Sequence, residues 1–218
     1  MRTDIRFQGS IDLERYGLFL EVVDGDGYMN SIQRCRDERI VLPTFQELCY
    51  PSSIPADIQS AVRSVNPGQA HPLNLFRVHW YNRWDKKDQA LVPEYIELPT
   101  ALTGVKARIV MVLGNRFPMI GAHKVLAAYA CLVPRIVSGH FDPTQHRAIW
   151  PSTGNYARGG IAISRLLRCR GVAVLPENMS QERFDWLNRW VVSSSDTVSY
   201  THLRAHETEA DLVCRLLL

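Results

Sequence analysis

The fold of this chain is decided by residues 148–176, which read AIWPSTGNYARGGIAISRLLRCRGVAVLP. The apolar residues 148–150 predict a short strand that ends in the polar loop 151–155. A helix is expected over residues 156–169, and the apolar run 171–176 predicts a second, buried strand. Four residues of this helix can form its core face: Ile161, Ile163, Leu166 and Leu167. Strand, helix and strand with short loops indicate an α/β fold with a parallel sheet and right-handed crossovers.

The flanking segments extend this pattern in both directions. Residues 108–113 form a continuous apolar run before Gly114, which is typical of a strand buried on both faces of a parallel sheet. Residues 122–132 are rich in alanine and predict a helix. After the second strand, Ser180 is placed to cap a further helix. Its apolar residues include Phe184, Trp186 and Leu187.

Residues 1–75 are interpreted as an N-terminal extension, because they show no clear repeat of strand and helix. Within them, residues 18–23 predict a strand and residues 51–65 a helix. Residues 24–27, Asp-Gly-Asp-Gly, predict a turn. They do not begin a calcium-binding loop, since the twelfth position is Cys35, where such a loop needs a glutamate.

The composition is that of a soluble globular protein, with 46% hydrophobic and 22% charged residues among 218. A net charge of +3, carried by scattered basic residues, gives no reason to expect nucleic acid as a partner. The five cysteines contain no Cys-x-x-Cys pair, so we expect neither a metal site nor a disulfide framework. No signal peptide or membrane-spanning run is recognised, which predicts a cytoplasmic location without membrane partners.

The last 22 residues differ in character from the rest. Residues 197–208, TVSYTHLRAHET, resemble the in-frame translation of a transposon-end adapter used in sequencing libraries. Residues 212–218, LVCRLLL, resemble the distal end of the same adapter. We therefore expect residues 197–218 to be an artefact, and residues 76–196 to be an incomplete catalytic domain whose natural continuation is missing.

Two loops, each between a strand and a helix, carry the candidate chemistry. Lys124 lies in the first turn of the expected helix 122–132, an end that electrostatically prefers negative charge. The loop 151–155 offers hydroxyl groups, a glycine and an amide side chain beside another helix N-terminus, which suits a carboxylate or phosphate. Taken alone, Lys124 also fits a solvated surface lysine, and the second loop fits an ordinary helix cap.

Together, the two loops resemble those of the fold type II pyridoxal-phosphate enzymes. Residues 121–124, Gly-Ala-His-Lys, resemble the Schiff-base lysine motif of tryptophan synthase β chains. Residues 151–155, Pro-Ser-Thr-Gly-Asn, resemble the substrate-carboxylate loop of the cysteine synthases. Their separation, 155 − 124 = 31 residues, agrees with the family spacing. Residues 98–102 resemble the Thr-Pro-Leu entry segment more loosely, and the whole resemblance covers residues 95–192.

The resemblance assigns a role to each residue of the two motifs. Lys124 would hold pyridoxal 5'-phosphate as an imine and move the α-proton of the substrate, with His123 near the cofactor phosphate. Asn155 would hydrogen-bond the 3' oxygen of the cofactor. Backbone amides would bind the substrate carboxylate, namely those of Ser152, Thr153 and Gly154. Tyr156 departs from the family, where a threonine is common, and the phosphate loop would lie beyond Asp196.

The activity implied by the resemblance is β-elimination or β-replacement on a small amino acid, as in cysteine synthase. A threonine synthase-like enzyme, an amino-acid ammonia-lyase, and a non-catalytic cofactor-binding or regulatory subunit remain open. The resemblance leaves a homodimer open as the assembly of the parent protein. Because the phosphate loop would be missing, residues 1–196 alone are expected to be inactive and to lack tight cofactor binding.

Overall fold

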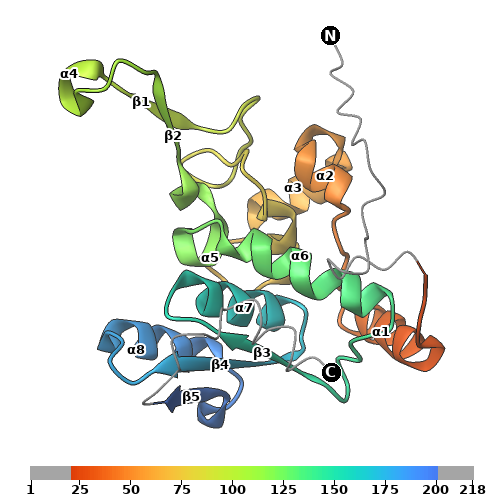
Figure 1. Cartoon of the computed structure of the whole chain (residues 1–218). Helices are drawn as coiled ribbons and strands as arrows, with labels where there is room; N and C mark the ends of the chain where they lie inside the picture. Colours follow the sequence, from red (N-terminus) through yellow and green to blue (C-terminus); the bar gives the residue numbers. More distant parts are fainter. Residues whose placement is uncertain (1–20, 201–218) are drawn as a thin grey trace.

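The computed structural model describes residues 21–200 and shows a mixed α/β architecture built around a parallel sheet (Figure 1). The sheet contains β3 (Arg147–Pro151), β4 (Arg170–Pro176) and β5 (Thr197–Tyr200) in that order, with both neighbouring pairs parallel. The two strands expected from residues 148–176 and their parallel arrangement are confirmed. Strand β5 lies at the start of the segment set aside as an artefact, and residues 201–218 lie outside the described residues.

One face of this sheet is covered by α7 (Asn155–Leu166), the helix that joins β3 to β4. Burial alternates along β4, with Gly171, Ala173 and Leu175 buried, as expected for a strand that is covered on one face. Helix α6 (Lys124–Val137) packs on the other side of α7, so that α7 lies between the sheet and α6 (Figure 1). Both helices were expected from the sequence.

The close packing around α7 depends on two adjacent glycines. A Cβ atom on Gly159 would lie 2.7 Å from the carbonyl oxygen of Lys124, and one on Gly160 would collide with the Trp150 ring. The Trp150 indole N–H in turn donates a 3.0 Å hydrogen bond to Ser164. The Gly-Gly pair therefore allows α7 to approach both α6 and the sheet.

Residues 25–77 form five helices, of which α1 packs on α6 and η3 packs on α7. These are α1 (Gly25–Asp37), α2 (Phe45–Cys49), η2 (Pro51–Ser53), α3 (Ala56–Ser64) and η3 (Pro72–Arg77). Ile40, Leu48 and Leu75 belong to the same hydrophobic cluster as the α/β unit. The Tyr129 hydroxyl of α6 also donates a 2.6 Å hydrogen bond to the Pro43 carbonyl. The residues interpreted as an extension thus share one core with the rest.

Three local expectations for the N-terminal residues meet different outcomes. The turn predicted at residues 24–27 is wrong, because Asp24 caps the N-terminus of α1 by accepting from the backbone N–H groups of Asp26 and Gly27. Half of the strand predicted at 18–23 lies outside the described residues, and residues 21–23 are not in a strand. The helix expected over 51–65 is confirmed as η2 followed by α3.

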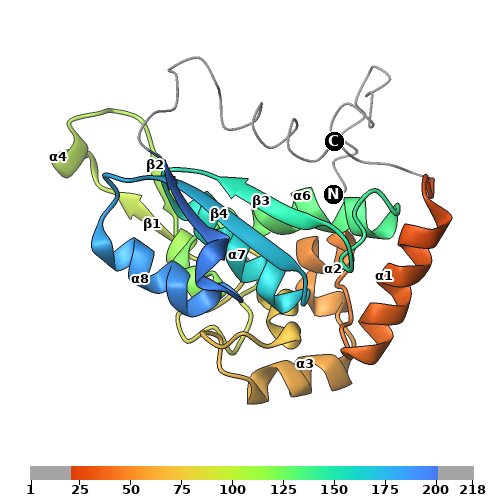
Figure 2. The ribbon, with the colours of Figure 1, turned by 90° about the horizontal axis from the view of Figure 1, so that it is seen from below.

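Residues 95–112 form an arm that projects from the rest in both views (Figures 1 and 2). It contains β1 (Tyr95–Leu98), α4 (Thr100–Thr103) and β2 (Ile109–Val112), with the two strands antiparallel. The expectation of a parallel strand buried on both faces at 108–113 is wrong, since β2 is largely exposed. Two short helices, η4 (Gly114–Arg116) and α5 (Pro118–Gly121), return the chain to α6.

The chain after β4 forms α8 (Gln181–Trp190), which packs against α7, and η5 (Ser194–Asp196), which leads into β5. Ser180 occupies the N-cap position of α8 as expected, although its side chain makes no capping hydrogen bond. Leu187 is the buried residue of this helix, and the Trp186 and Trp190 rings stack on one another. Within residues 21–200, no helix has the length and apolarity needed to cross a membrane.

Candidate functional site

Lys124 is the first residue of α6, and its side chain is half-buried. The backbone turns sharply just before it, with Gly121 at a φ of 60°, and the helix begins without a side-chain cap. Its carbonyl oxygen is in close contact with Gly159 of α7. Lys124 is therefore the first residue of α6, at the point where α6 meets the first turns of α7.

The loop 152–155 connects β3 to α7, with Gly154 at the N-cap. The Ser152 amide donates to the Val174 carbonyl at 3.1 Å, and the Gly154 amide donates to the Ser152 hydroxyl oxygen at 3.1 Å. Two of the three amides expected to hold a substrate carboxylate are thus already engaged. The Ser152 amide is used by the sheet, and the Gly154 amide is used by the Ser152 side chain. Beside this loop the fold presents the backbone amides at the start of α7, where no side chain caps the helix.

Two arginines flank this helix N-terminus. Arg158 donates from Nη1 to the Asn155 side-chain oxygen at 3.4 Å, and its guanidinium carbon lies 4.6 Å from the centre of the Trp186 ring. Its Nε atom is buried and has no hydrogen-bond partner. Burial, and then the nearby Arg183 cation, lower the pKa of Arg158. Arg158 is therefore a half-buried group rather than the solvated helix arginine that its sequence position favours.

Arg183 of α8 was not anticipated from the sequence. It donates from Nη1 to the Thr153 carbonyl at 2.9 Å, which ties α8 to the loop. The only sequence signal was its position in the first turn after the Ser180 cap, and that signal does not identify a partner. Together, the amides at the start of α7 and the two arginines make this end of the fold attractive to an anion.

His123, expected near a cofactor phosphate, is exposed and stacks on Trp80 with ring centres 5.5 Å apart. Trp80 also contacts Phe117 edge-on at 4.9 Å. His123 thus contacts the loop that follows η3, and its side chain is accessible.

Tyr156 extends between the helices. Its hydroxyl donates to the Cys131 sulfur of α6 at 3.3 Å, and its ring meets the Trp150 ring edge-on at 5.6 Å. The phenol therefore joins α7 to α6 and to β3 through these two contacts. A threonine at this position would be too short to make either of them.

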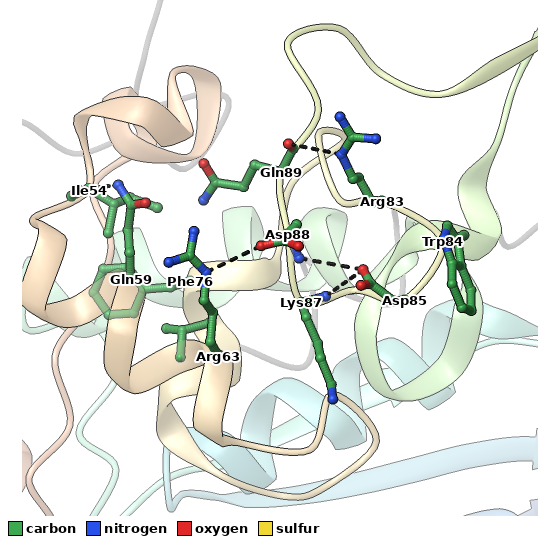
Figure 3. Close-up of a pocket in the computed structure, with 11 residues that line it drawn as sticks. Ile54, Gln59, Arg63, Phe76, Arg83, Trp84, Asp85, Lys87, Asp88 and Gln89 are labelled. Atoms are coloured by element: carbon green, nitrogen blue, oxygen red, sulfur yellow. Dashed lines mark hydrogen bonds and ion pairs between the residues drawn. The ribbon is translucent and has the colours of Figure 1, made fainter.

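Three cavities of about 520 to 610 Å³ open on the part of the chain that the structure describes, and neither Lys124 nor Asn155 lines any of them. The largest has an apolar floor that includes Ile54 and Phe76 (Figure 3). Arg63 and Asp88 form an ion pair at 3.3 Å across it, while the Trp84 ring points away from that pair. This cavity is distinct from the Lys124 site, because Lys124 does not line it.

Within residues 21–200, no group of three or more His, Cys, Asp or Glu side chains could hold a metal ion. Compared with protein-family models, with curated proteins and with solved structures, the chain matches none of them.

Proposed function

We propose that this chain carries the lysine side of a pyridoxal-phosphate site of the kind used for β-elimination or β-replacement on a small amino acid. The observation that carries the proposal is the close packing of the Lys124 backbone carbonyl on Gly159, which brings together the starts of the two helices that follow the resembling motifs. A lysine and an anion-attracting helix start are the two groups that such chemistry needs side by side.

The residues present fit the cofactor and an amino-acid substrate by their chemistry. Lys124 supplies a primary amine at the edge of the core, and the start of α7 supplies backbone N–H donors. The unpartnered Nε of Arg158 is a buried donor close to that helix start. When bound, pyridoxal phosphate supplies the electron sink for the reaction.

Each group would then have a defined task. The Nζ atom of Lys124 would hold the cofactor and would take up and return the α-proton of the substrate. The first amides of α7, supported by Arg158 and Arg183, would orient the substrate carboxylate. The Asn155 side chain, which accepts from Arg158, would hydrogen-bond the cofactor.

The test is reductive trapping of the lysine with the cofactor. The full chain is mixed with pyridoxal phosphate, reduced with borohydride, digested and mapped by mass spectrometry, a procedure that captures even weak complexes. We expect Lys124 to be labelled well ahead of Lys106, an exposed lysine of the arm that serves as the internal control. Equal labelling of the two lysines would refute the proposal.

A second measurement tests which lysine forms the imine, since the chain is expected to lack turnover of its own. With excess pyridoxal phosphate, the imine absorbance near the edge of the visible range should be weaker in the Lys124→Ala variant than in the unmodified chain. The Lys106→Ala variant should keep the absorbance of the unmodified chain. Circular dichroism of both variants establishes that they are folded.

A further inference from the structure

A cavity of about 520 Å³ lies at the opposite end of α7 from the candidate site. It lies where the second half of α1, the end of α7 and the start of β4 meet. Its wall carries four arginines and one carboxylate: Arg34, Arg165, Arg168, Arg170 and Glu38. Helix α7 has twelve residues, so about 18 Å separates the cavity from the start of that helix.

The carboxylates of the neighbourhood do not balance these cations. Glu38 lies 3.8 Å from Arg168, and the buried Asp196 lies 2.7 Å from Arg170. Asp142, whose carboxylate accepts from the lining residue Thr144, is a third carboxylate, so four guanidinium groups less three carboxylates leave a net charge of +1. Like charges brought together in this way repel one another unless an anion lies between them.

Two of the four arginines have no carboxylate partner among residues 21–200. The Arg165 side chain makes neither a hydrogen bond nor an ion pair there. Arg34 donates from Nη2 to the Arg168 carbonyl, and its buried Nε has no hydrogen-bond partner. A buried N–H is normally satisfied, so this donor is an exception beside the cavity.

The C-terminal dipole of α7 does not account for the whole cluster. A helix C-terminus attracts cations with about half an elementary charge, which suits Arg165 in the last turn. It gives no reason for Arg34 on α1 and Arg170 on β4 to converge on the same cavity. Guanidinium groups that come together from three elements are instead what the binding of a multivalent anion requires.

The lining also limits the chemical class of the anion. Guanidinium groups match phosphate oxygens in pairs, and four of them can serve more than one phosphoryl group. Pro143 and Val192 are the apolar lining residues, and no aromatic ring is present on which a base could stack. A compact phosphorylated molecule therefore fits better than a nucleotide or a nucleic acid.

We propose that this cavity is a binding site for a small anion bearing two phosphoryl groups or their equivalent, for which inorganic pyrophosphate is the simplest probe. The site stands independently of the proposed pyridoxal-phosphate chemistry. At its distance from Lys124, it would act as an effector site rather than as part of the candidate active site.

The experiment is calorimetric titration of the full chain with pyrophosphate at constant ionic strength and without pyridoxal phosphate. We expect saturable binding with one site per chain. The Arg165→Gln and Arg34→Gln variants should each bind at least about tenfold more weakly, because each removes charge-assisted hydrogen bonds. Urea unfolding of each variant establishes that the fold is retained.

The matched control is Arg36→Gln, which removes the same charge from the same helix as Arg34 but does not line this cavity. The affinity of the Arg36→Gln variant for pyrophosphate should stay within about twofold of the affinity of the unmodified chain. Absence of saturable binding, or equal weakening by Arg36→Gln, would overturn the proposal. Labelling of Lys124 by pyridoxal phosphate should persist in Arg165→Gln, which separates this site from the other.

Discussion

Strands β4 and β2 begin from similar apolar sequences and reach opposite environments. In β4, Leu175 is 1% exposed, whereas Met111 in β2 is 46% exposed. Strand β4 lies between two parallel neighbours and under α7, while β2 pairs only with β1 on an arm that projects from the molecule (Figure 1). An apolar run therefore favours a strand, but the elements packed on it decide whether it is buried.

The largest expected difference comes from truncating one side chain in each strand. Leu175→Ala should lower the free energy of unfolding by about 2–5 kcal/mol, because it leaves a cavity under α7. Met111→Ala should change it by about 0.5 kcal/mol or less, since its side chain is already largely hydrated. Urea denaturation followed by circular dichroism measures both values. A cost at Met111 that matches the cost at Leu175 would show that the arm is covered in solution.

A second difference concerns pH and the loop between η3 and the arm. His79 is 1% exposed, and burial lowers its pKa to about 4. The unfolded chain, with an ordinary histidine pKa of about 6.5, binds the proton more readily than the folded chain. The contribution of His79 to the free energy of unfolding is thus complete above about pH 6.5 and declines as the pH falls towards 4. We expect a loss of about 2 kcal/mol between pH 7.5 and pH 5.

The His79→Gln variant isolates this contribution, because glutamine does not titrate. Between pH 7.5 and pH 5, the free energy of unfolding of this variant should fall by about 2 kcal/mol less than that of the unmodified chain. A direct NMR titration of the His79 ring supplies an independent value. An identical pH dependence in both proteins would rule out a buried, neutral His79.

The smallest expected effect is at the base of the arm. Arg116 and Glu94 form a 2.5 Å ion pair that joins the two ends of the hairpin, and both side chains are largely shielded from solvent. Glu94→Gln should weaken the closure of the arm by at most about 1 kcal/mol. Amide exchange in β1 and β2 should then accelerate by up to about fivefold, with global stability unchanged.

The control for this prediction lies on the same arm. Glu97 pairs with Arg108 at 2.9 Å, but both side chains are well exposed. Glu97→Gln makes the same charge change and should leave the exchange rates nearly unaltered, because water screens the pair. Equal acceleration by both variants would mean that net charge, and not the shielded pair, holds the arm closed.

The sequence predicted most of the α/β unit because its signals are local. The apolar spacing in residues 156–169 and the run 171–176 require only a helix period and a continuous strand. The arm was misjudged because a strand's burial depends on partners far away in sequence. The same limit applies to the site, where Lys124 and the loop 151–155 carry recognisable motifs while Arg183 carries none.

By itself, the sequence determined the helices and strands of the α/β unit and predicted which two loops carry the candidate chemistry, because periodicity, glycines and motif residues act over a few positions. The tertiary structure alone decided that the Lys124 backbone meets Gly159, that the Ser152 amide is used by the sheet, and that four arginines, from α1, α7, β4 and the turn before β4, line one cavity. These outcomes depend on the packing of segments far apart in the chain, and no local pattern encodes that packing.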